Sequence, residues 1–190
     1  MMECKSCFFI GHREADERLL PRLELIIDRL ISEETVRYFY VGVYGGFDRI
    51  AATAVKRAKQ KYPDITLMLV LTYHPAERAI PTPNGFDGTY HPEGLENTPR
   101  RYAIVRTNQI MVNTCDWLIC YVRHGASNSR NLLEYAQRRA QKNLSRLRIS
   151  ARVRMVVYEK ESAFGNWDRY NATGVNSGYY PVYGDSKMPD

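Results

Sequence analysis

The chain has 190 residues, of which 44% are hydrophobic, and it carries a formal net charge of +6. This length and composition suffice for one hydrophobic core without a disulfide or a structural metal. No apolar run approaches the roughly 20 residues that span a bilayer, and the N-terminus lacks the pattern of a secretory signal. We therefore expect a cytoplasmic protein with no membrane contact.

Cysteine spacing gives little support for a metal site. Cys4 and Cys7 form a CxxC pair, while Cys115 and Cys120 flank the apolar segment DWLI. Residues three apart on a strand point to opposite faces of the sheet, so neither pair is placed to share one zinc ion. We expect buried or half-buried free thiols, and neither a metal nor a cofactor.

Strand-like and helix-like segments alternate along the chain. Short β-branched and aromatic runs predict buried strands, and apolar residues at steps of three and four predict helices between them. The predicted strands are 7–10, 36–44, 65–71, 116–122 and 151–158, and the predicted helices are 19–31, 47–62, 99–114 and 128–142. Pro21 lies in the first turn of the first helix, where a missing N–H costs nothing.

This alternation predicts an α/β fold, a Rossmann-like doubly wound sheet that is mostly parallel and has helices on both faces. We expect one domain over residues 1–160, followed by a Tyr/Gly-rich tail over 161–190. The segment 73–98 is rich in proline and glycine, and its length is typical of a lid or a binding loop.

Ligands of such sheets bind outside the carboxyl ends of the strands. The turns predicted at that edge supply these candidate ligand-binding residues: Gly11, His12, Arg13, Gly45, Gly46, Phe47, Asp48, Gly125, Ser127, Asn128, Ser129 and Arg130. Asn128 or Ser129 would cap the following helix.

The pair Gly45-Gly46 stands where a strand turns into a helix. Glycine allows close approach of a ligand to the backbone, and the helix N-terminus favours an anion such as phosphate. The alternative is a tight turn that needs a positive φ and nothing more.

The charge excess lies within residues 99–150 and consists mostly of arginine, the side chain suited to bidentate phosphate contacts. A solvated helix face or a surface for an anionic ligand or nucleic acid explains it equally well. Arg130 and Glu134 lie four residues apart on one helix face. They form either a surface ion pair or a site whose carboxylate orients a sugar hydroxyl.

Several segments, in this order along the chain, carry a family resemblance: FFIGHR, YVGVYGGFD and SNSRNLLEYA. They resemble the SLOG superfamily, in particular its YpsA-like branch, over about residues 4–145. That superfamily is related to the LOG phosphoribohydrolases and to the Rossmann domain of the DNA-processing protein DprA. The resemblance implies a Rossmann-like nucleotide-binding fold with its ligand on the turns named above.

LOG enzymes use an arginine and the glutamate of a PGGxGTxxE motif to cleave a nucleoside 5′-monophosphate into base and ribose phosphate. The resemblance makes Arg106 and Glu134 the analogues of this catalytic pair. The proline and the glycine pair of the motif are missing here, and Asn131 takes the place of its threonine. The resemblance thus implies the fold and leaves the reaction open.

Three functions follow from these observations. We expect a protein that binds a nucleotide or a nucleotide-derived signal, as a sensor or a sequestering protein, with Tyr73, His74 and Tyr90 of the 73–98 loop contacting the ligand. The alternatives are a nucleoside 5′-monophosphate N-glycosidase of LOG type and a single-stranded nucleic-acid binder of DprA type. Helix 99–114 is a dimer surface in many relatives, so the resemblance also implies a homo-oligomer.

Overall fold

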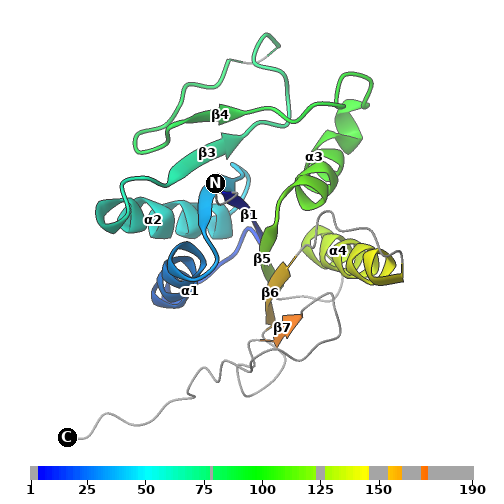
Figure 1. The fold of residues 1–190 in the computed structure, drawn as a ribbon. Helices are drawn as coiled ribbons and strands as arrows, with labels where there is room; N and C mark the ends of the chain where they lie inside the picture. Colours follow the sequence, from blue (N-terminus) through cyan, green and yellow to red (C-terminus); the bar gives the residue numbers. More distant parts are fainter. Residues whose placement is uncertain (1–3, 78, 123–126, 146–153, 160–167, 171–190) are drawn as a thin grey trace, which may run out of the picture.

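The computed structural model describes residues 4–77, 79–122, 127–145, 154–159 and 168–170. Its centre is a seven-stranded sheet with the order β4-β3-β2-β1-β5-β6-β7 (Figure 1). The strands are β1 (Lys5–Gly11), β2 (Val36–Val41), β3 (Thr66–Val70), β4 (Gly88–Tyr90), β5 (Trp117–Val122), β6 (Arg154–Glu159) and β7 (Asp168–Tyr170). The helices are the 3₁₀ turn η1 (Glu17–Leu19), α1 (Leu20–Ser32), α2 (Gly46–Lys61), α3 (Arg100–Thr114) and α4 (Asn128–Ser145).

Neighbouring strands run parallel from β4 to β6, and only β7 pairs antiparallel. The chain builds the sheet outward from β1 through β2 and β3 to β4, and then returns to place β5 on the other side of β1. The prediction of a doubly wound α/β fold is thereby confirmed. The reversal between β1 and β5 is the switch point at which such sheets bind ligands.

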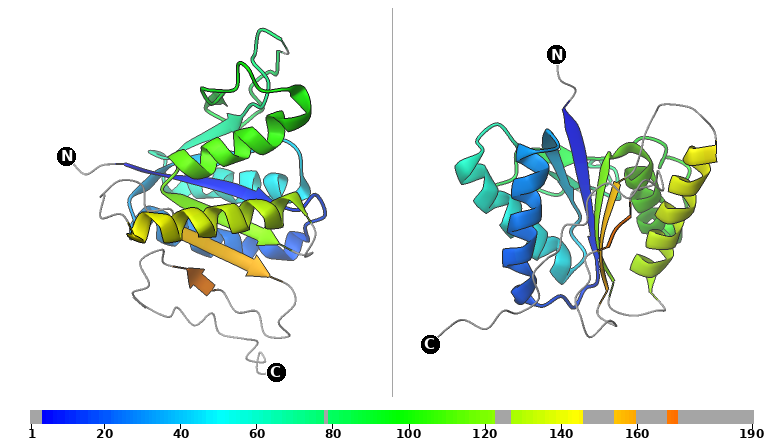
Figure 2. Two further views of the ribbon diagram at one scale, coloured as in Figure 1. Left: turned by 90° about the vertical axis from the view of Figure 1, so that its right-hand side faces the viewer. Right: turned by 60° about the horizontal axis from the view of Figure 1, so that its bottom comes forward.

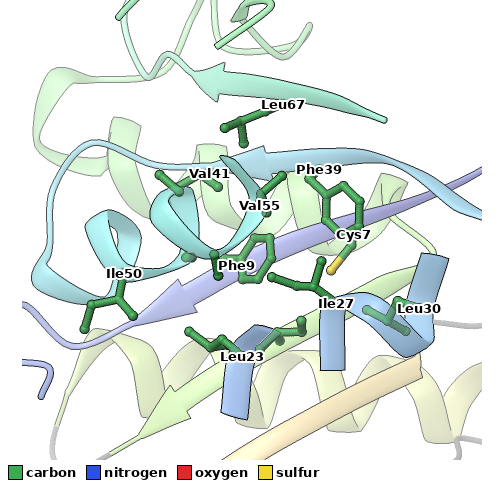
Figure 3. Packing of buried hydrophobic residues seen from close by; sticks show 14 of the residues in the cluster. Cys7, Phe9, Leu23, Ile27, Leu30, Phe39, Val41, Ile50, Val55 and Leu67 are labelled. Carbon is green, nitrogen blue, oxygen red and sulfur yellow. The ribbon is translucent and has the colours of Figure 1, made fainter. Parts of the chain in front are cut away.

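Helices cover both faces of the sheet: α1 and α2 lie on one face and α3 and α4 on the other (Figure 2). The period-2 alternation of a strand explains why both faces are apolar. In β1, Cys7 and Phe9 join the core under α1 and α2, whereas Phe8 and Ile10 join the core under α3 and α4. Figure 3 shows the first of these cores, with Phe9 and Phe39 facing α1 and α2.

Strand β5 is buried along its whole length, so its continuous apolar sequence is that of a central parallel strand. Trp117, the first residue of β5, is 2% exposed. The expected free thiols are confirmed for Cys7, Cys115 and Cys120, which are buried, while Cys4 is free and exposed. Burial raises the pKa of the Cys115 thiol to about 12, so at neutral pH this thiol is protonated and unreactive.

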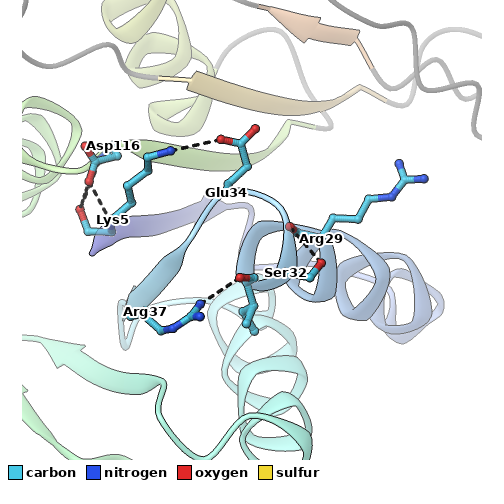
Figure 4. A network of polar contacts seen from close by, with 8 residues as sticks. Lys5, Arg29, Ser32, Glu34, Arg37 and Asp116 are labelled. Carbon is cyan, nitrogen blue, oxygen red and sulfur yellow. Dashed lines mark hydrogen bonds and ion pairs between the residues drawn. The ribbon is translucent and has the colours of Figure 1, made fainter. Parts of the chain in front are cut away.

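At the amino edge of the sheet, hydrogen bonds join β1 to the residue that precedes β5. Asp116 Oδ2 accepts hydrogen bonds from the Ser6 N–H at 2.8 Å and from the Ser6 hydroxyl at 2.9 Å. On the same edge, Lys5 pairs with Glu34, and Arg37 donates to the Ile31 carbonyl (Figure 4). These polar contacts lie at the end of the sheet opposite the switch-point turns.

The long loop differs from the prediction because it contains β4, which pairs parallel with β3. Asp87 holds this part of the loop to the sheet: its carboxylate accepts from the Leu67 N–H at 2.7 Å and from Lys59 Nζ at 2.5 and 2.6 Å. Two further differences are small. Pro99 caps α3 rather than opening it, and β7 lies within the segment that we expected to be a tail.

Within the described ranges, none of the helices combines the length and the apolar character needed to cross a membrane.

Candidate functional site

A cavity of about 240 Å³ lies at the carboxyl end of β1, beside the switch point of the sheet. Four elements build it: the end of β1 and the turn after it, the β2–α2 turn, one face of α3, and the start of α4. Its lining residues are Phe8, Phe9, Ile10, Gly11, His12, Arg13, Gly42, Tyr44, Gly45, Asp48, Ile104, Asn108, Ser127, Asn128 and Ser129. Many of the polar turn residues expected from the sequence therefore surround one cavity.

The start of α4 forms the wall beside β5. The Ser127 hydroxyl accepts from the Arg130 N–H at 3.1 Å, so Ser127 is the N-cap, rather than Asn128 or Ser129 as predicted. A serine hydroxyl at this position serves one of the orphan N–H groups of the first turn. The N–H groups of Asn128 and Ser129 have no acceptor within the helix, and both residues line the cavity.

Two basic residues follow β1 beside this wall. His12 Nε2 lies 3.5 Å from the Ser127 hydroxyl, and the His12 ring stands edge-on to Tyr121 with centroids 6.2 Å apart. Arg13 is exposed and also lines the cavity. The positive end of the α4 dipole and the His12 ring thus lie side by side, and the arrangement favours an anion.

The glycine pair of the β2–α2 turn has a structural reason that the sequence did not reveal. The Gly46 N–H donates to the Arg13 carbonyl at 2.7 Å, and the Phe47 N–H donates to the His12 carbonyl at 3.3 Å. A Cβ on Gly46 would overlap the Arg13 carbonyl oxygen. Gly45 has a φ of −146°, so a positive φ is not the reason either. Glycine lets two backbone segments meet, and the first N–H groups of α2 are used in doing so.

Asp48 folds back under the same turn and lines the cavity. Its carboxylate accepts from the Tyr44 N–H at 3.1 Å. Burial raises the pKa of Asp48 to about 6, although hydrogen bonds from the Tyr44 and Gly45 backbone act in the opposite direction. Its two oxygens offer about four acceptor positions, so the backbone bonds leave acceptor capacity inside the cavity.

Gly11 and Phe47 belong to the packing around the site. A Cβ on Gly11 would overlap the Phe47 ring. Phe47 is 2% exposed and stacks on Tyr121 with centroids 5.6 Å apart. The Phe47 side chain therefore supports the cavity wall from behind.

Of the remaining expected site residues, those that the structure describes lie outside the cavity lining. Arg106 is on the exposed face of α3, near the exposed Tyr102 and Val105. The Glu134 carboxylate is 53% exposed and lies 3.9 Å from Arg138. The proposed catalytic pair is thus not brought together in this pocket.

Two expected site residues of the 73–98 loop contact other side chains near the edge of the sheet. His74 is exposed and its ring meets that of His91 at 5.4 Å. Tyr90 packs against Tyr40 with centroids 5.1 Å apart. Gly125 lies outside the described residues, so the structure says nothing of its expected role.

Sequence reasoning missed three lining residues of β1, Gly42 and Tyr44 after β2, and two residues of α3. Ile104 and Asn108 line the cavity from the inner face of that helix. Ile104, Asn108 and Met111 recur at steps of four and three, and a lone amide in an apolar stripe was a readable signal.

A scan against protein-family models gives no match for this chain, and a search of the curated proteins gives none either.

Proposed function

We propose that the protein binds a nucleotide or a nucleotide-derived signalling molecule in the cavity at the carboxyl end of β1, with a phosphate group at the N-terminus of α4. The observation that carries this proposal is the convergence of Ser127, Asn128 and Ser129 with His12 at the switch point. A helix N-terminus with unused backbone N–H groups is a general phosphate-binding arrangement. The family resemblance in the same segments supports the same ligand class.

The size of the cavity restricts the ligand. Its volume of about 240 Å³ is below the roughly 300–1,000 Å³ of pockets that enclose drug-sized ligands. One nucleotide fits such a volume with part of the molecule exposed. The geometry therefore supports binding of a small ligand in this compact site best. The exposed arginines of α3 take no part in the site.

Two observations favour binding over N-glycosidase activity. Arg106 and Glu134, the analogues of the LOG catalytic pair, are exposed and do not line the cavity. Among the described lining residues, Asp48 is the one with a carboxylate. The Tyr44 N–H donates to this carboxylate and holds it against the β2–α2 turn. We therefore propose a sensor or sequestering protein.

Native mass spectrometry of the protein purified from cells tests the proposal. We expect a bound small molecule that, once released, is identified as a phosphate-bearing nucleotide derivative. The variant Asn128→Glu places a negative charge at the first turn of α4, where it is compatible with the helix dipole but repels a phosphate. It should lose the bound molecule.

The matched control is Asn131→Glu, one turn further along α4, where the side chain is exposed and lies outside the cavity lining. This variant should retain the bound molecule. Equal retention by both variants would show that the ligand does not depend on the α4 N-terminus and would overturn the proposed site.

A further inference from the structure

We propose that Asp48 is the specificity-determining residue of this site and accepts hydrogen bonds from the ribose hydroxyls of the ligand, so that the site selects ribonucleotides over 2′-deoxyribonucleotides. This inference rests on the proposed function and adds a sugar-recognition role to it. It names the chemical feature that a bound nucleotide must present.

The argument begins with the polarity of the cavity. The α4 side offers hydrogen-bond donors through the backbone N–H groups of Asn128 and Ser129, which form the positive end of the helix dipole, and His12 lies beside them. Asp48 comes from the β2–α2 turn, and in its ionised form it accepts hydrogen bonds but donates none. A phosphate bound at the first side is repelled from the second. A ligand that fills both sides therefore carries an anion at one end and hydrogen-bond donors at the other.

Within a nucleotide, the group next to the 5′-phosphate is the ribose, whose two adjacent hydroxyls are donors. A carboxylate with two oxygens can accept from both hydroxyls at once, as it does from other paired donors. Because the cavity is only about 240 Å³, the sugar next to the phosphate, rather than the more distant base, fills the space beside Asp48.

The carboxylate is fixed before the ligand arrives. The Tyr44 N–H donates to it at 3.1 Å, and Gly42 leaves room for it: a Cβ on Gly42 would lie 3.0 Å from Asp48 Oδ2. An acceptor held by the backbone loses little conformational freedom on binding. A 2′-deoxyribose would leave one of its acceptor positions in this part-buried site without a donor, which makes the site discriminate against the missing hydroxyl.

Isothermal titration of the wild-type protein with the four common ribonucleoside 5′-monophosphates and their 2′-deoxy counterparts tests the inference without any variant. We expect at least one ribonucleotide to bind, and its 2′-deoxy counterpart to bind roughly ten- to a hundredfold more weakly, the range for a hydrogen bond to a charged group. Equal affinity within that pair would overturn the role of Asp48 and leave the proposed function standing. Absence of binding by all eight probes would overturn this inference, whereas the proposed function is overturned by the mass-spectrometry result described above.

Two variants assign the preference to this residue. Asp48→Asn keeps the size of the side chain but removes the charge and one acceptor, and should reduce the ribose preference to less than about threefold. Gly42→Ala keeps Asp48 but crowds its Oδ2, and should reduce the preference in the same direction. Both are checked for a native thermal transition before titration. An undiminished preference in folded Asp48→Asn would contradict the inference.

Discussion

Gly46 and Arg13 are joined by a backbone hydrogen bond of 2.7 Å, through which the start of α2 closes against the segment after β1. The contact brings two walls of the cavity together, because Arg13 and the neighbouring Gly45 both line it. The candidate site is therefore sensitive to the shape of the β2–α2 turn.

Gly46→Ala should lower the free energy of unfolding by about 2–3 kcal/mol, because its Cβ would overlap a backbone oxygen that has little freedom to move. Gly45→Ala is the matched control. Its Cβ would lie 3.4 Å from the nearest atoms of His12 and Arg13, and its φ of −146° suits alanine, so it should cost less than about 1 kcal/mol. Urea unfolding of both variants measures the difference, and equal costs would show that close approach is not the reason for Gly46.

Asp116→Ala should destabilise the protein by about 1–3 kcal/mol, because it removes the acceptor of two Ser6 donors at the start of β1. Ligand affinity should stay unchanged in the folded variant, since this contact lies at the amino edge and the cavity at the carboxyl edge. Chemical denaturation and titration with the co-purified ligand measure the two effects separately. A large loss of ligand affinity at unchanged stability would contradict the assignment of a structural role to the amino edge and of ligand binding to the carboxyl edge.

The raised pKa of Asp48, about 6 against a usual value of 3.8, predicts a pH effect on stability. The folded protein binds this proton more tightly than the unfolded chain does, so stability rises as pH falls from about 7 to about 4. Relative to Asp48→Asn, the wild type should gain at most about 3 kcal/mol over this range, because each pKa unit corresponds to about 1.4 kcal/mol.

Subtracting the unfolding free energies of the two proteins at each pH cancels the other titrating groups. A difference that stays flat, or that falls as the pH is lowered, would show that Asp48 is not buried as the structure has it.

Arg106→Ala and Glu134→Gln should each leave ligand affinity within about twofold of the wild type, because both side chains are exposed and outside the cavity lining. Asn128→Glu serves as the positive control for lost binding. A tenfold loss of ligand affinity in either variant would place the ligand on the outer surface of α3 and α4. Such a result would favour the LOG-type reaction.

Thiol labelling should modify Cys4 rapidly and Cys7, Cys115 and Cys120 only after unfolding. Cys4 is exposed and the other three are buried, and burial raises the pKa of Cys7 and Cys115, which keeps them as unreactive thiols. Mass spectrometry of the native protein after brief treatment with iodoacetamide counts the modified sites. More than one rapid modification would contradict the packing of β1 against β5.

The sequence predicted the fold because each element carried its own periodic signal. The apolar run of β5 and the three-and-four spacing of α1 depend only on local alternation, which survives without knowledge of the neighbours. The short strand β4 was missed, since its three residues carry no period and are positioned by the distant pair Asp87 and Leu67.

The candidate site was predicted in part. The edge of the sheet followed from topology, and the structure places His12, Asp48 and Ser127 in the lining of the cavity there. The inner face of α3 was left out of the prediction. Arg106 and Asn108 are two positions apart, and the packing of α3 turns Asn108 toward the cavity and leaves Arg106 exposed.

Backbone amide NMR during titration with the co-purified ligand tests the central claim most directly, because it locates the phosphate. The account predicts that the largest shifts occur at the amides of Asn128 and Ser129, with smaller shifts at Gly46 and Phe47, whose N–H groups already donate to Arg13 and His12. Shifts centred on Arg106 and the outer face of α3, with Asn128 and Ser129 unmoved, would contradict it.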